Sequence, residues 1–108
     1  MTHFAVIRAE HLQTSASYTI RMHSTSPIPD REAALVMGNY IVSQGQNPFD
    51  FAVLVFNGLD DTRSKALYDS FEGDRITPTD AQKLVTQLNR SGDAQHFVNR
   101  MPFDPRAN

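Results

Sequence analysis

Apolar and polar residues alternate strictly through residues 17–23. One side of an extended chain carries Tyr18, Ile20 and Met22, and the other carries Thr19, Arg21 and His23. This period of two is typical of a half-buried β-strand.

Residues 3–10 also form a strand-like pattern, but apolar residues fall on both of its sides. This segment is therefore either a central strand or a strand with one face turned to a partner. The polar link 11–16 predicts a hairpin loop between the two strands.

A third strand is predicted over residues 49–56, where the chain is nearly continuously apolar after Asp50. Such a run favours a strand buried on both faces, and we expect 51–56 to be the middle strand of the sheet. Asn57 and Gly58 predict that this strand ends there and passes into a loop.

Helical spacing follows the second strand, with Pro29 suited to the first helical position and Gly45 to the stop. The apolar positions of this helix are Ala33, Val36, Met37, Tyr40 and Ile41. A second helix is capped by Asp60 or Asp61 and stops at Gly73. Its predicted inner positions are Ala66, Leu67, Ser70 and Phe71.

Two more helices are predicted towards the C-terminus. Thr77 and Pro78 begin the first, and apolar residues follow at i, i+3, i+4 and i+7. Ser91 or Asp93 begins the last, which Pro102 ends. The order of elements is β-β-α-β-α-α-α. It predicts an α+β fold: a small two-layer domain with a three-stranded, mainly antiparallel sheet covered by amphipathic helices.

Composition agrees with one modest globular domain. The chain has 108 residues, 40% of them hydrophobic and 20% charged, with a net charge of -2 and no Cys. We expect a compact domain over 1–101 and a short irregular tail over 102–108. The longest apolar run, 51–56, is too short for a transmembrane helix, and no secretory signal or lipidation motif is apparent, so a cytoplasmic protein with no membrane partner is expected.

Catalytic, cofactor and metal motifs are not found. His3, His11 and His23 lie in or beside the predicted hairpin without the spacing of a zinc site. The stretch 69–80 has the length of a calcium loop, and Ile76 and Thr77 fall at its hydrophobic and ninth positions. It does not fit calcium, because its third position is Phe71, its glycine is displaced and its last position is Asp80 rather than a glutamate. The expectation is a protein that is not an enzyme and holds no cofactor or metal.

The function hypothesis is a small non-enzymatic protein that docks onto another protein. Such domains include bacterial adaptors and phage- or plasmid-encoded inhibitors of host defence, a class suggested by size and charge alone. Residues 60–80 carry six acidic and three basic side chains, which suits a basic groove. The candidate interface residues are Arg21, His23, Asp60, Asp61, Asp74 and Phe103.

Two alternatives remain open. A nucleic-acid-binding regulator would use Arg90, Arg100 and Arg106 as a basic patch, although the pI near 6.0 does not favour it. A small enzyme would need a site assembled in space from residues distant in sequence. Homodimerisation is compatible with each of these, since an edge strand in so small a sheet invites pairing.

Overall fold

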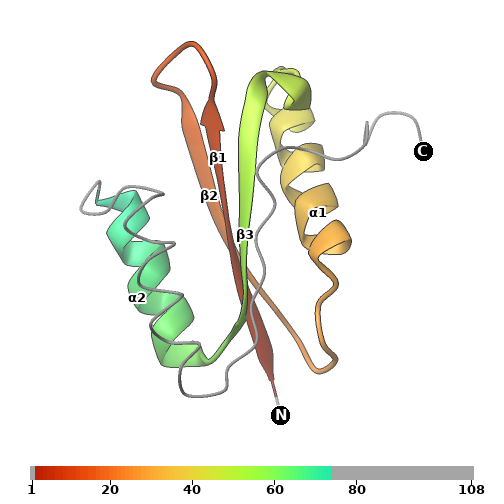
Figure 1. Cartoon of the computed structure of the whole chain (residues 1–108), viewed down its shortest axis with the longest axis vertical. Coiled ribbons are helices and arrows are strands. Elements are labelled where there is room, and N and C mark those ends of the chain that lie inside the picture. Colours follow the sequence, from red (N-terminus) through yellow and green to blue (C-terminus); the bar gives the residue numbers. More distant parts are fainter. Residues whose placement is uncertain (1, 74–108) are drawn as a thin grey trace.

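The computed structural model of the chain describes residues 2–73, in which one helix covers each face of a three-stranded antiparallel sheet (Figure 1). The elements are β1 (His3–His11), β2 (Ser17–Ser24), α1 (Asp30–Ser43), the 3-10 turn η1 (Pro48–Asp50), β3 (Phe51–Leu59) and α2 (Asp61–Glu72). The α+β class, the antiparallel sheet and the element order through the second helix are confirmed. The helices expected after residue 76, and the boundary between domain and tail, lie outside the described residues.

The strand order is β2-β1-β3, so β1 is the central strand. The prediction that 51–56 forms the middle strand is therefore wrong. β3 is buried above and below, but burial of its two faces says nothing about which strands flank it. The apolar residues on both sides of β1 are explained by α1 on one face of the sheet and α2 on the other. β1 is also the central strand, one of the two interpretations that the sequence left open.

The two helices lie on opposite faces, so the sheet is the middle of three layers instead of one of two. On the first face α1 packs over β1 and β3, and the buried residues include Ala5, Ile7, Ala33, Met37, Ile41, Phe51, Val53 and Val55. On the second face α2 packs over β1 and β2, and the buried residues are Val6, Leu54, Phe56, Leu59, Leu67 and Phe71. The sheet thus separates two small cores.

Helix α1 ends where its sequence predicts. Gly45 has φ +77° and donates to the carbonyl of Val42, and the Gln46 N–H donates to the carbonyl of Ile41. This pair of bonds is a Schellman motif, which a glycine in the left-handed region permits. Only part of the expected apolar stripe is buried, because Val36 and Tyr40 remain 42% and 41% exposed.

Strand β3 continues through Asn57 and Gly58, so the loop predicted at these residues is wrong. Between the pairs Phe4–Leu59 and Val6–Phe56, these two residues lie opposite the single residue Ala5. Gly58 has φ +72°, which supplies the left-handed conformation of a β-bulge. A glycine often ends a strand in a turn, but Gly58 lies within a strand that bends and then continues.

The bulge is tied to the start of α1 by the side chain of Asn57, which is 9% exposed. Its amide nitrogen donates to the carbonyl of Ile28 and to the Asp30 carboxylate, the latter at 3.0 Å. Its amide oxygen accepts from the Gly58 N–H at 2.8 Å. One buried side chain therefore fixes the entry of α1 against β3.

Helix α2 begins at the predicted cap, since the Asp60 carboxylate accepts from the Arg63 N–H at 2.7 Å. Leu67 and Phe71 are buried as expected. Ser64 is also buried, which the sequence did not indicate. No helix among residues 2–73 is long and apolar enough to cross a membrane.

Candidate functional site

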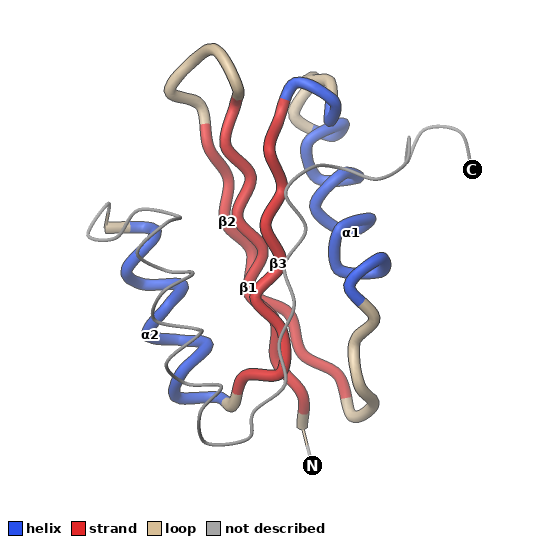
Figure 2. The backbone as a smooth tube through the Cα atoms, in the orientation of Figure 1, coloured by secondary structure: helices blue, strands red, loops and turns tan. Residues whose placement is uncertain are grey.

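The hairpin loop, the C-terminal end of α1 and η1 meet at one end of the sheet (Figure 2). Aromatic rings run along this end on the α1 face. The Tyr18 ring lies 5.4 Å from that of Tyr40 and 5.6 Å from that of Phe51, and the His11 ring lies 5.0 Å from that of Phe51. Strands β1, β2 and β3 and helix α1 each contribute one ring to this row.

Three large apolar side chains at this end face water. Leu12 is 50% exposed, Phe49 is 45% exposed and Tyr40 is 41% exposed. The Leu12 N–H donates to the carbonyl of Asp50 at 2.9 Å, which holds the hairpin loop beside η1. We call Leu12, Tyr18, Tyr40, Phe49 and Phe51 the aromatic end. Exposed apolar groups gathered in one place mark contact surfaces more often than scattered ones do.

The predicted start of the third strand is wrong. Phe49 was expected to begin the third strand, but it lies in η1 and the strand begins at Phe51. The turn forms because Pro48 stands at its first position and the Asn47 side chain accepts from the Phe49 N–H at 3.0 Å. The turn leaves the Phe49 side chain exposed instead of pairing it into the sheet.

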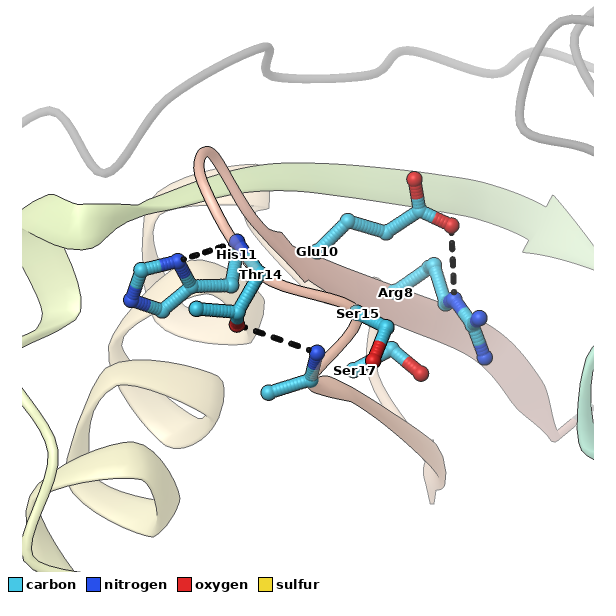
Figure 3. A pocket seen from close by; sticks show the side chains of 7 residues that line it. Arg8, Glu10, His11, Thr14, Ser15 and Ser17 are labelled. Atoms are coloured by element: carbon cyan, nitrogen blue, oxygen red, sulfur yellow. Dashed lines mark hydrogen bonds and ion pairs between the residues drawn. The ribbon is translucent and has the colours of Figure 1, made fainter.

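A polar hollow lies on the α2 face beside the hairpin loop (Figure 3). Its lining residues are Arg8, Glu10, His11, Thr14, Ser15, Ala16 and Ser17. Arg8 is buried and its guanidinium donates to Thr19 Oγ1 at 2.7 Å and to Glu10 Oε2 at 3.3 Å. The guanidinium also lies 5.1 Å from the centre of the Phe71 ring, a cation–π contact.

The polar groups of this hollow are largely occupied with each other. His11 Nδ1 accepts from the N–H groups of Gln13 and Thr14, both at 3.1 Å, so a neutral ring carries its proton on Nε2. The His11 ring points away from Arg8 and Glu10 (Figure 3). No hydrogen bond in the described part of the chain joins a serine hydroxyl to His11 or Glu10. The hollow therefore lacks the nucleophile–base pair that acyl transfer requires.

Arg21 and Asp61, two candidate interface residues, are brought together across the gap between β2 and α2. The Arg21 guanidinium forms an ion pair with the Asp61 carboxylate and donates to Ser64 Oγ at 2.9 Å. It also lies 4.8 Å from the centre of the Phe4 ring. These contacts direct the charge of Arg21, on β2, to helix α2 of the same chain, where it helps to hold α2 on the sheet.

The other candidate residues have separate surroundings. His23 is exposed and its ring lies 5.8 Å from that of Phe4. Asp60 caps α2 and forms an ion pair with Arg63 at 3.6 Å. Asp74 and Phe103 lie outside the described residues. Within 2–73, no three His, Asp or Glu side chains are grouped so as to hold a metal ion.

Electrostatically, residues 2–73 are acidic, with five Lys or Arg side chains against eight Asp or Glu. Desolvation and the charge and hydrogen bond of nearby Glu72 raise the pKa of Tyr68 above its ordinary value of 10. Exposed Asp50 places a carboxylate next to Phe49 of the aromatic end. Glu10 lies on the α2 face, where it pairs with Arg8.

The residues that define this surface were absent from the candidate interface set. Leu12 is the one large aliphatic residue in the polar link 11–16, which is a weak signal for an exposed apolar residue. Tyr40 fits the helical stripe and was expected inside. Comparison with protein-family models, with curated protein sequences and with solved structures finds no match.

Proposed function

We propose that this protein is a non-enzymatic binding domain, of the inhibitor or adaptor type, that docks onto a target protein through the aromatic end. The observation that carries the proposal is the joint exposure of Leu12, Tyr40 and Phe49 at one end of the sheet. A few well-packed residues, with Trp, Tyr and Arg the most enriched, supply most of the binding free energy in protein interfaces. The inner members of the row, Tyr18 and Phe51, give these anchors a packed base.

A carboxylate beside the aromatic end specifies the kind of target. Asp50 is exposed and adjoins Phe49 in the chain. The complementary target surface is an apolar groove bordered by Lys or Arg side chains, because potentials of opposite sign favour encounter and register. This replaces residues 60–80 as the main contact, since Arg21 and Arg63 already pair with Asp61 and Asp60.

The test is a comparative capture from a lysate of the source cells, with the full chain as bait, carried out once with nuclease and once without it. The paired variant Leu12→Ser/Phe49→Ser removes the outermost anchors. The matched control, Thr62→Ser/Lys65→Ser, alters exposed positions on α2, away from the aromatic end. We expect one protein in stoichiometric amount with the wild type and the control, and its loss with the paired variant.

Two outcomes contradict the proposal. Equal capture by the paired variant would show that another surface binds the target. Capture that disappears on nuclease treatment would instead favour the nucleic-acid alternative, whose affinity should fall steeply with salt.

A further inference from the structure

Within residues 2–73, strand β2 is paired along one side only. It pairs with β1 along its whole length, from His3 opposite Ser24 to Glu10 opposite Ser17, without a register shift. No strand pairs with its other side among residues 2–73. Edge strands are commonly protected by proline, a bulge or inward charge. β2 contains no proline and no bulge, and the charge of Arg21 is held by Asp61 on the α2 face.

The backbone groups on the free side can be assigned from the hairpin. The His11 N–H donates to the carbonyl of Ala16, and these residues are directly opposite, which makes them a hydrogen-bonded pair. Bonded and non-bonded pairs alternate along an antiparallel ladder. The N–H and C=O groups of Tyr18, Ile20 and Met22 therefore point to β1. Those of Ser17, Thr19, Arg21 and His23 point outward.

The side chains of β2 also remain incompletely covered. Tyr18, Ile20 and Met22 pack against the first core but are only partly buried, because α1 lies mainly over β1 and β3. Val36, on α1, is 42% exposed one turn before Tyr40, which touches Tyr18. The free backbone edge is thus accompanied by an apolar flank.

We propose that β2 pairs antiparallel with β2 of a second copy of the chain, about a twofold axis at Ile20. In this register Thr19 forms a bonded pair with the partner's Arg21, and Ser17 forms one with the partner's His23. All four outward-pointing residues are then used, and each bonded pair exchanges two backbone hydrogen bonds. Ile20 meets its symmetry mate, and Tyr18 meets the partner's Met22, a favourable sulfur–aromatic combination.

Self-complementarity is the reason for choosing a second copy. A register centred on Arg21 would set two guanidinium groups opposite each other, and like charges directly opposite destabilise a sheet. A register centred on Thr19 would leave His23 unpaired. The register at Ile20 alone satisfies every outward group of β2 and opposes no like charges.

The second face accommodates the same arrangement. Helix α2 lies over β1 and β2, so its two copies would be separated by about two strand spacings, or ~10 Å. This is the ordinary distance between packed helices. The hollow beside β2 is lined by Arg21, Asp61, Lys65, Tyr68 and Asp69, a mixture of positive and negative groups that suits antiparallel copies.

A disulfide test reads the register directly, because the chain contains no Cys. In Ile20→Cys the two Cα atoms of a non-bonded pair at the axis would be about 4.5 Å apart, within the ~4.4–6.8 Å range of disulfides. In Met22→Cys they would be ~14 Å apart. We expect mild oxidation to cross-link Ile20→Cys into a covalent dimer and to leave Met22→Cys monomeric. Equal cross-linking of both variants, or of neither, would overturn the register.

Sedimentation equilibrium tests the association itself. We expect the wild type to have twice the chain mass of 12.1 kDa. Ile20→Lys should be monomeric, because two ammonium groups would meet at the axis. Leu12→Lys, outside the pairing surface, should remain dimeric. A wild type that sediments as a single chain at its solubility limit would contradict the proposal.

The two proposed surfaces meet at Tyr18, and variants on either side of it test the two proposals separately. Ile20→Lys should lose the dimer and keep the target protein, whereas Leu12→Lys should lose the target protein and keep the dimer. A circular dichroism spectrum matching the wild type is the folding check for both variants. Loss of both properties in a folded Ile20→Lys would contradict the separation of the two surfaces.

Discussion

Replacement of Asn57 tests how the β3 bulge is joined to α1. Asn57→Ala removes the amide that donates to the Ile28 carbonyl and the Asp30 carboxylate, and that accepts from the Gly58 N–H. At about 1 kcal/mol net for each bond, the loss is about 2–3 kcal/mol. This is a large part of the ~5–15 kcal/mol that stabilises a domain of this size. In urea the unfolding midpoint should fall by about 1–2 M with an unchanged m-value.

Asn57→Asp gives the sharper result. It keeps the shape and the acceptor, but places a carboxylate where the amide nitrogen lies 3.0 Å from Asp30 Oδ1. Repulsion should make it less stable at pH 7 than Asn57→Ala. The pKa of the new carboxyl is then raised in the folded state above its unfolded value of ~3.9. The stability it lacks at pH 7 should therefore return as the pH falls through the raised pKa.

The control is Asn39→Asp, the same chemical change at an exposed position on α1. Its unfolding midpoint should differ little from the wild type across this pH range. If Asn57→Asp were as stable as the wild type at pH 7, or if its deficit did not shrink between pH 7 and pH 4, the hydrogen bonds assigned to Asn57 would be wrong.

Three further perturbations probe the second core. Phe71→Ala should cost about 3–5 kcal/mol in urea unfolding, because the ring is 1% exposed; a loss below ~1 kcal/mol would contradict its central place. A double-mutant cycle with Arg21→Met and Asp61→Asn should give a coupling of only about 0.2–1 kcal/mol, since the Asp61 side chain is 76% exposed. Tyr68→Phe should remove a pH dependence of stability, because the raised pKa of Tyr68 implies that the wild type loses stability relative to the variant as the pH rises above 10. Thermal-unfolding midpoints of the two proteins that change in parallel with pH in this range would refute this.

Local patterns in the sequence predicted the elements well. The alternation of Tyr18, Ile20 and Met22 and the caps at Gly45 and Asp60 each depend on residues within one turn or strand, and each is confirmed. These features follow from local side-chain direction and local hydrogen bonding. They do not depend on how distant segments pack.

The wrong predictions concern features that are determined by contacts between distant parts of the chain. The continuous apolar run over 51–56 indicates that both faces of this strand are covered. The position of the strand in the sheet depends instead on which strands form hydrogen bonds with its two edges. Gly58 with a positive φ suits a turn or a bulge equally, and only the register with β1 distinguishes them. Likewise, the stripe on α1 is wider than the sheet beneath it can cover, which leaves Val36 and Tyr40 outside.

The candidate site was predicted least well for the same reason. Arg21 and Asp61 are separated by 40 positions, so their ion pair was not apparent from spacing. Both were proposed to contact a partner, but they contact each other. Leu12 and Phe49 become neighbours of one surface only because β1 carries the hairpin to the end of the sheet where β3 begins.

The bulge on β3 bears on how far assembly can proceed. A subunit with two regular, self-pairing edges would add copies without limit and grow into a fibre, as open head-to-tail contacts do. Here the bulge at Asn57 and Gly58 interrupts β3 near its end and leaves residues 51–56 as the regular stretch of that strand. If β2 pairs with a second copy as proposed, the bulge shortens the remaining edge to which further chains could add. The bulge that fixes the start of α1 would thus also disfavour the addition of further chains at β3.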